Sequence, residues 1–346
     1  MGAAGAGRLR EVEPAAWDGL LDGLGCRDAY FRRGFFDAAR LVEPGAATLL
    51  HLEGAGGHVV FACIVREVPA GHGARDVVTP YGYGGPLALG ADPPVARFHE
   101  LYEEWCAAEG VVTTFVRFHP LHENWRYAAP RARLERLANT ASWPLRPDAD
   151  LLGEMHAKHR REIRRGVEAG LETVVRPAPE ELGDFVALYE DTMRRRDADA
   201  FYFFSAAYWD ALAAGLRERL LVVDGRFDGE LVASALFLAT TPWLHYHLGA
   251  MRDPGGSLGA TKVVLYEAAR WAREQGYVEL HLGSGLGGRE DSLWRFKQRF
   301  SPSPGREFWI GKLVHDEARY RELAGDAPTD GYFPAYRAAA AVEARR

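Results

Sequence analysis

Trp243-Leu-His-Tyr-His-Leu-Gly-Ala-Met-Arg-Asp-Pro-Gly-Gly-Ser-Leu-Gly-Ala260 joins a strand to a helix through a glycine-rich loop, and this junction decides the fold. Residues 243–250 alternate between an apolar face and a face with His245 and His247, as in a half-buried strand. Helical periodicity follows over about 260–275 and stops before a glycine. The stretch therefore predicts a strand, a loop and a helix in that order.

Further strands flank this junction on both sides. Residues 220–227 and 230–239 are β-branched and apolar, and Asp228-Gly229 between them is a hairpin signal. Residues 277–282 predict another strand after the helix. A weaker version of the same order occupies the first half, with expected strands at 47–53, 58–68, 76–83 and 111–118 and an expected helix at 95–109. The pattern indicates an internal duplication of one supersecondary unit.

The length of 346 residues and the globular composition, 47% hydrophobic and 26% charged, predict two domains. Residues 139–150, rich in Pro and Asp, predict a linker between them, with helices at 151–170 and 179–195 after it. A polar helical tail after Lys312 is expected to pack back on the first domain.

Composition also limits the function classes. A net charge of −6 argues against a protein that coats nucleic acid, although local basic patches can still bind a few phosphates. No window of about 18 apolar residues and no signal peptide occur, so a cytoplasmic protein is expected. Cys26, Cys63 and Cys106 are widely spaced, which predicts buried thiols and neither disulfides nor a zinc cluster.

Two features are candidates for acyl-transfer chemistry. Backbone N–H groups of the glycine loop, at the start of a helix, are expected to bind a phosphate or an acyl carbonyl; the alternative is a turn without a ligand. Residues 291–300 predict an amphipathic helix on which Lys297 stands beside Phe296. A lysine there would stabilise the oxyanion formed when an amine attacks an ester or thioester; the alternative is a solvated lysine.

Two basic runs are candidates for phosphate binding. The first, residues 158–165, includes Arg161 and Arg164, and the second, Arg194-Arg-Arg196, precedes four aromatic residues at 201–204. Arginine suits phosphates and aromatic rings suit stacking on bases or sugars. Solvated helix faces are the alternative, and the second run is the more specific of the two.

The first half offers a candidate acceptor pocket at its strand ends. Its expected lining residues are Tyr81, Tyr83, Arg117 and His119, although tight turns alone would explain the neighbouring glycines. His245 and His247 share a strand face, but no carboxylate or cysteine completes a ligand set at useful spacing, so no metal is expected. No Walker loop, dinucleotide fingerprint or Gly-x-Ser-x-Gly motif is present, so no covalent serine or cysteine mechanism is indicated.

Several of these segments together resemble the FemABX-type aminoacyltransferases and related FemAB-like proteins of the GCN5-related N-acetyltransferase (GNAT) fold. The resemblance covers most of the chain and is strongest over 150–313. The matching segments are Arg160–Gly170, Leu188–Arg196, His245–Gly249, the loop to Gly259, and Phe296–Phe300, with support from Tyr81–Pro86 and Arg117–Pro120.

The resemblance implies an α/β (α+β) fold with two tandem GNAT-like domains, whose mixed, mostly antiparallel sheets are flanked by helices. The implied first domain is 1–145, completed by a C-terminal helix at 317–346, and the second, 146–316, carries the acyl-transfer site. Characterised members join an amino acid from aminoacyl-tRNA to an amine, often on a cell-wall precursor.

The resemblance also implies roles for single residues. Lys297 and Phe296 would form the transfer centre, and Arg196 and Tyr202 would bind an acceptor phosphate, with Tyr81, Tyr83, Arg117, His119, His245 and His247 as further substrate contacts. Donor contacts would come from Arg161, Arg164, Arg252, Gly255, Gly256, Ser257 and Gly259. GNAT enzymes hold the coenzyme A pyrophosphate at this loop by Arg/Gln-x-x-Gly-x-Gly/Ala; Arg252 and Gly255 fit, but Ser257 takes the last position.

Three functions remain open at this point. The first is amide-bond formation from aminoacyl-tRNA onto a small or cell-envelope amine, without a cofactor or a required general base. The second is N-acylation from an acyl-coenzyme A. The third is a non-catalytic tRNA- or carrier-binding protein on the same scaffold.

Overall fold

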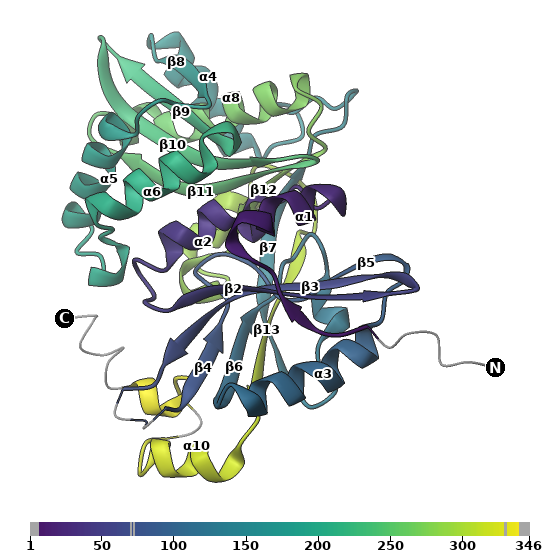
Figure 1. Ribbon diagram of the computed structural model, residues 1–346. Helices are drawn as coiled ribbons and strands as arrows, with labels where there is room; N and C mark the ends of the chain where they lie inside the picture. Colours follow the sequence, from purple (N-terminus) through teal and green to yellow (C-terminus); the bar gives the residue numbers. More distant parts are fainter. Residues whose placement is uncertain (1–6, 70, 72, 329–330, 339–346) are drawn as a thin grey trace. The chain divides into compact units, whose positions relative to one another are not determined.

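The structure is a computed structural model that describes residues 7–69, 71, 73–328 and 331–338 (Figure 1). The described chain divides into two compact units. Unit 1 comprises residues 7–26, 30–137 and 308–338, and unit 2 comprises residues 27–29 and 138–307. The divisions after residues 137 and 307 fall inside strands, whereas the sequence predicted boundaries after residues 145 and 316. The C-terminal helix expected at 317–346 is shorter in the described residues, with an α-helix at Glu317–Ala324 and a 3-10 turn at Ala335–Arg337, and residues 339–346 lie outside the described residues.

Unit 1 contains a mixed sheet with the order β1-β2-β3-β4-β6-β13, and β5 pairs with β3. Its strands are β1 (Arg10–Glu11), β2 (Ala46–Gly54), β3 (Gly56–Glu67), β4 (Arg75–Val78), β5 (Leu87–Asp92), β6 (Val111–Arg117) and β13 (Arg306–Val314). Its helices are α1 (Trp17–Gly23), α2 (Arg33–Ala39), α3 (Val95–Ala108) and α10 (Glu317–Ala324). Phe98, Tyr102 and Cys106 recur on one face of α3 and are buried against the sheet, which fixes that helix on it.

Unit 2 contains a second mixed sheet with the order β7-β12-β11-β10-β9-β8. Its strands are β7 (Arg133–Pro144), β8 (Glu172–Pro177), β9 (Leu220–Phe227), β10 (Glu230–Thr240), β11 (Trp243–Met251) and β12 (Glu279–Gly283). Its helices are α4 (Ala157–Glu168), α5 (Gly183–Arg195), α6 (Ala206–Leu216), α7 (Gly255–Leu258), α8 (Ala260–Glu274) and α9 (Ser292–Gln298). Val264, Ala268 and Ala272 of α8 are buried in the core of this unit.

The predicted order of strands and helix around the glycine loop is confirmed. The hairpin between β9 and β10 turns at Asp228 and Gly229, both with positive φ. The loop after β11 contains the short helix α7, and Gly259 then adopts φ +69° where α8 begins. The fold class, a mixed α/β architecture with helices on mixed sheets, is also confirmed. The three cysteines are buried and free, as predicted.

Two local predictions are wrong. Residues 139–144 are not a linker but the end of β7, where Trp143 pairs with Leu280 and is fully buried. The two prolines and two aspartates of residues 139–150 suggested a loop, yet the alternate residues Ala141, Trp143 and Leu145 are all buried core. The helix expected from residue 151 begins only at Ala157, because residues 151–156 form a turn.

None of the described helices combines the length and the apolar composition needed to cross a lipid bilayer.

Candidate active site

The candidate site of unit 2 lies where two parallel strands part. β11 and β12 are paired only as far as His245 and His281. Beyond this point β11 stays paired with β10 up to Met251, and β12 stays paired with β7 up to Gly283. The two strands therefore diverge, and among the described strands none pairs with the β12-facing edge of β11 after His245. Open α/β sheets bind ligands at such a parting, beyond the carboxyl ends of parallel strands.

Lys297, on α9, stands at this parting. Its Nζ donates a hydrogen bond to the carbonyl of Ser284, the residue after β12, at 2.8 Å. The same nitrogen lies 5.4 Å from the ring centre of Tyr246, the first β11 residue beyond the paired segment. The side chain is 9% exposed. The predicted transfer residue is thus a buried ammonium held between the ends of two strands, and it is not a solvated lysine.

Burial lowers the pKa of Lys297 from 10.5 to about 8, and the charge of Asp291 opposes this shift. Asp291 is the N-cap of α9 and accepts hydrogen bonds from the N–H groups of Trp294 and Leu286 at 2.9 and 3.0 Å. Burial alone would raise the pKa of Asp291, but these N–H groups lower it overall. Asp291 therefore organises the loop between β12 and α9 and keeps a negative charge near the lysine.

The lowered pKa of Lys297 predicts how acyl transfer depends on pH. If the ammonium form of Lys297 stabilises an oxyanion, kcat/KM for acyl transfer is expected to fall as pH rises through about 8, because the free enzyme then loses that charge. The measurement is a pH–rate profile from pH 6 to 10 with an acceptor whose amine titrates below pH 6. A profile that instead rises through pH 8 would show that the neutral amine of Lys297 acts as a base.

Phe296, the other predicted transfer residue, lies beside α4. Its carbonyl hydrogen-bonds to Nε2 of buried His159 at 2.9 Å, and its ring lies 5.3 Å from Nζ of Lys262. Lys262 pairs with Glu162 at 3.1 Å. Burial lowers the pKa of His159 to about 4, so its imidazole is uncharged near neutral pH. Its hydrogen bond then links α4 to α9 without adding a charge. Phe296 therefore anchors the helix that carries Lys297.

Arg196 lies near Tyr246. It follows α5, which is fixed to the end of β11 because the N–H of Met251 donates to the Thr192 hydroxyl at 3.0 Å. Burial raises the pKa of Tyr246 to about 12, and the nearby positive charge of Arg196 opposes this rise. The structure thus brings Arg196 and Lys297 to the same tyrosine. Tyr202 lies in a 3-10 turn capped by Asp199, and its ring contacts Phe201.

The glycine loop lies against α4. Arg165 of α4 donates to the carbonyl of Ser257 at 2.6 Å, and the Ser257 hydroxyl donates to the carbonyl of Pro254 at 2.8 Å. Of the predicted donor contacts in this loop, Gly255 and Gly259 are buried, while Gly256 and Ser257 are exposed. The exposed part of the loop is therefore accessible at the start of α8.

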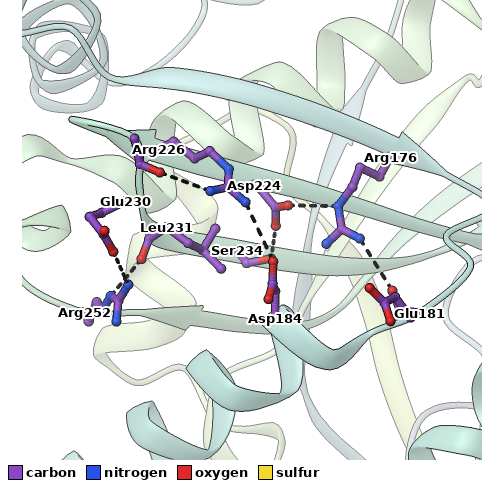
Figure 2. Close-up of polar contacts among 10 residues, drawn as sticks. Arg176, Glu181, Asp184, Asp224, Arg226, Glu230, Leu231, Ser234 and Arg252 are labelled. Carbon is purple, nitrogen blue, oxygen red and sulfur yellow. Dashed lines mark hydrogen bonds and ion pairs between the residues drawn. The ribbon is translucent and has the colours of Figure 1, made fainter.

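Arg252 has a different environment from the other loop residues. Figure 2 shows its guanidinium bonded to the carbonyl of Leu231, at 2.8 Å, and to the carboxylate of Glu230, at 3.2 Å. The neighbouring strands of the same sheet carry buried Asp224, which pairs with Arg176 at 2.9 Å and accepts from Ser234 at 2.6 Å. Arg252 thus ties the loop to the β9–β10 hairpin.

The two basic runs differ in how far their charge is neutralised. On α5, Arg194 pairs with Glu190 and Arg195 pairs with Asp191, each one helical turn away. On α4, Arg161 and Arg164 are exposed and have no carboxylate within ion-pair distance among the described residues. Phe204, one of the four aromatic residues after the second run, stacks on Tyr208 in the core. The first run therefore carries the larger unneutralised charge, whereas the sequence favoured the second run because of its aromatic neighbours.

His245 and His247 lie on the strand face opposite Tyr246, because alternate residues of a strand point to opposite faces. Nδ1 of His245 lies 3.2 Å from Nδ1 of His281, whose Nε2 bonds to the hydroxyl of Thr140 at 2.8 Å. Burial lowers the pKa of His247 to about 4, and His245 lowers it further. The structure does not bring these two predicted substrate contacts to the face of β11 on which Lys297 stands.

In unit 1 the corresponding parallel pair does not part in the same way. β4 and β6 are paired up to Val78 and Phe115, and a bridge between Gly84 and Phe118 joins the chain again further on. The guanidinium of Arg117 also donates to the carbonyl of Thr79 across this gap, at 2.6 Å. The gap that is open in unit 2 is closed here.

The other predicted residues of unit 1 lie around this bridge. Tyr83 and His119 are buried with their ring centres 5.5 Å apart, whereas Tyr81 is exposed. Burial raises the pKa of the Tyr83 hydroxyl. Nδ1 of His119 accepts the N–H groups of Leu121 and His122. The structure brings Tyr83 and His119 together, while the guanidinium of Arg117 is directed to Thr79.

Sequence reasoning missed the loop that presents the lysine. Ser284, Tyr246, Asp291 and His159 all contact or hold Lys297 and its helix, and none was among the predicted site residues. One signal was available: Gly283-Ser-Gly-Leu-Gly-Gly288 stands between a predicted strand and a predicted helix. The contacts of His159 and Tyr246 are long-range and left no local signal.

Comparison with known proteins identifies the class. The sequence pattern of the Acetyltransferase (GNAT) domain family matches residues 153–298, which include β11, the glycine loop, β12 and Lys297. The matched residues all lie within unit 2. No curated protein matches the sequence.

The whole chain is similar in fold to several solved structures. FemX superimposes with a TM-score of 0.67 at 12% identity, over 91% of this chain and 99% of FemX. L-PGS from Bacillus licheniformis superimposes with a TM-score of 0.59 at 14% identity, over 87% and 92% of the two chains. A tandem GNAT protein from the clavulanic acid biosynthesis pathway superimposes with a TM-score of 0.52 at 11% identity, over 90% of this chain and 99% of that protein. The chain thus has a FemABX-like GNAT fold, as the sequence resemblance implied.

Proposed function

We propose that the protein transfers an aminoacyl group from an aminoacyl-tRNA to the amine of a small or cell-envelope acceptor. The observation that carries this proposal is the buried ammonium of Lys297 at the parting of β11 and β12. Attack of an amine on an ester creates a tetrahedral oxyanion. A fixed cation in a site of low dielectric stabilises that charge far more than water does, without reorganising during the reaction.

The chemistry needs little more than alignment. The aminoacyl ester is already activated, so the protein has to hold a neutral amine against the carbonyl carbon and stabilise the developing charge. The unpaired edge of β11 beyond His245 offers backbone groups for orienting the acyl group. Arg196, beside Tyr246, is suited to an anionic group of the acceptor. The proton lost by the amine is expected to leave through substrate groups or water.

The exposed charge of α4 supports tRNA as the donor. Arg161 and Arg164 stand on this helix without carboxylate partners among the described residues, next to the helix's contacts with α9 and with the glycine loop. Unneutralised arginines on one helix face bind a phosphate backbone and release its counterions. The rest of the acidic chain limits the expected contact to the acceptor end of the tRNA.

A second candidate is N-acylation from an acyl-coenzyme A. The match to the GNAT domain family and the exposed residues Gly256 and Ser257 of the glycine loop favour it. Backbone N–H groups at the start of a helix bind pyrophosphate well. A binding protein without catalysis is the third possibility.

One experiment separates these functions. The purified protein is incubated with radiolabelled aminoacyl-tRNA or radiolabelled acetyl-coenzyme A, and label released onto small amines and cell-envelope precursors is measured. Label moving from tRNA supports the first proposal and identifies the amino acid. Label moving only from coenzyme A supports the second. Retention of tRNA without transfer to any amine supports the non-catalytic alternative.

The double substitution Arg161→Glu with Arg164→Glu is expected to weaken binding of aminoacyl-tRNA by roughly tenfold or more and to flatten its salt dependence. The physical reason is the loss of two phosphate contacts from α4. Filter binding at 50 to 200 mM salt measures both effects. The matched control is Arg194→Glu with Arg195→Glu on α5, whose arginines are already paired. Equal weakening by both pairs would contradict a specific role of α4.

A further inference from the structure

A cavity of about 210 Å³ lies in unit 1, and no part of the transfer chemistry uses it. Its walls come from the face of the sheet that carries Val78, Phe115 and Ile310, and from residues 331–333 near the end of the described chain. Three basic side chains and one carboxylate also line it: Arg66, Arg117, Lys312 and Glu43. At about 30 Å³ per water, the volume corresponds to roughly seven waters, the size of a small metabolite.

Two of the three cations are already neutralised. Nε of Arg66 donates to Asp76 at 2.7 Å, and Nζ of Lys312 pairs with Glu135 at 2.7 Å. Arg117 is different, because no carboxylate among the described residues lies within ion-pair distance of it. Its guanidinium stacks 4.8 Å over the ring of Phe115 and donates to the carbonyl of Thr79 at 2.6 Å. These contacts fix a planar cation that still requires a counterion.

Glu43 presents the opposite charge. Its Oε2 is buried and accepts no hydrogen bond from any described residue, and its nearest cation is Nη1 of Arg66 at 3.7 Å. A buried carboxylate oxygen without a donor costs free energy, and such atoms in native proteins are commonly satisfied by a ligand or by water. The cavity therefore combines Arg117, a cation without a carboxylate partner among the described residues, with a carboxylate oxygen of Glu43 that faces Arg66 but accepts no hydrogen bond from the described residues.

We propose that this cavity binds a free α-amino acid, with the ligand carboxylate on Arg117 and its ammonium on Glu43. A zwitterion satisfies both groups at once and leaves the net charge of the cavity unchanged. The rings of Phe115 and Phe333, whose centres lie 6.2 Å apart, and the side chain of Ile310 suit an apolar ligand side chain. The proposal does not depend on acyl transfer by unit 2, since it concerns binding alone.

The test is isothermal titration calorimetry on the full chain with each of the twenty L-amino acids in turn. At least one is expected to bind saturably at micromolar to millimolar concentration. For the tightest ligand, the amide, which lacks the carboxylate charge, and the deaminated acid, which lacks the amine, are each expected to bind roughly tenfold more weakly or worse. Equal binding of either analogue, or no saturable binding of any amino acid, would overturn the proposal.

Substitutions test the assigned partners. Arg117→Ala and Glu43→Gln are each expected to weaken binding by roughly tenfold or more. Glu43→Gln keeps the shape of the side chain, so it remains informative if Arg117→Ala fails to fold. The matched control is Arg133→Ala, which removes an exposed arginine of the same unit that does not line the cavity. Loss of binding in the control as well, or unchanged binding in Glu43→Gln, would contradict the assignment.

Discussion

Replacing Lys297 with methionine is expected to lower kcat for acyl transfer by roughly 10²- to 10³-fold, the usual effect of removing one oxyanion-stabilising donor. The ammonium is held by the Ser284 carbonyl at 2.8 Å and by the face of Tyr246, so its position is fixed before the substrate arrives. Methionine fills a similar volume but carries no charge. Single-turnover transfer of label from the donor identified above measures the effect.

The same substitution is expected to leave the unfolding temperature unchanged or higher. Because burial lowers the pKa of Lys297 to about 8, the charged side chain opposes folding by on the order of 3 kcal/mol below pH 8, and this penalty fades as pH rises toward 10.5. Methionine removes the penalty, although the Ser284 carbonyl loses its donor and offsets part of the gain. Loss of activity together with retained stability separates a chemical role from a structural one.

Arg295→Met is the matched control for Lys297→Met. Arg295 stands two residues earlier on α9 and is exposed. Removing its charge is expected to change kcat less than threefold, in line with surface substitutions in general. A Lys297→Met protein that keeps transfer within threefold of the unsubstituted chain would remove Lys297 from the chemistry and leave its burial without a functional explanation.

The duplication of the fold did not duplicate the site. Each unit has a parallel strand pair in the same place along its order, β4 with β6 and β11 with β12. Unit 1 closes the gap beyond that pair with the Gly84–Phe118 bridge and the Arg117 guanidinium, whereas unit 2 leaves it open beneath Lys297. We therefore propose that unit 2, whose gap is open, is the unit that binds the acyl group.

The sequence was most informative where local patterns determine structure. The alternation of residues 243–250 and the glycines before Ala260 predicted β11, the loop and α8 to within a residue or two. The prediction failed at residues 139–144, because the strand there is formed by pairing with strands such as β12, more than a hundred residues away along the chain. Residue propensities and turn-forming residues such as proline are local signals. Strand pairing between distant segments can override the secondary structure that they predict.

The same distinction applies to the site. Lys297 was selected from its helix spacing and from the family resemblance, but its burial depends on Ser284 and Tyr246, which come from other elements. The sequence also does not distinguish the unpaired arginines of α4 from the paired arginines of α5, since acidic residues lie close to both basic runs. Only the structure shows which charges are neutralised.

Gly285→Ala is expected to lower transfer by roughly 10²-fold without removing any functional group. A Cβ on Gly285 would overlap the carboxylate of Asp291 and the carbonyl of Arg289, so the loop between β12 and α9 has to move. Ser284 and Asp291 both belong to this loop, and together they hold Lys297 in position and keep a negative charge near it. A displacement of about 1 Å at a catalytic group is enough for an effect of this size.

The control for Gly285→Ala is Gly183→Ala, at the first residue of α5. A Cβ there meets no atom within 4 Å, and alanine favours the helix, so stability is expected to stay the same or rise by up to about 1 kcal/mol. Transfer rates and thermal melting of the two variants are compared at pH 7. If Gly285→Ala melts like the unsubstituted chain and transfers at the same rate, the loop is tolerant of the shift. The position of Lys297 would then not depend on the Ser284 carbonyl, and the oxyanion role would need a different anchor for the ammonium.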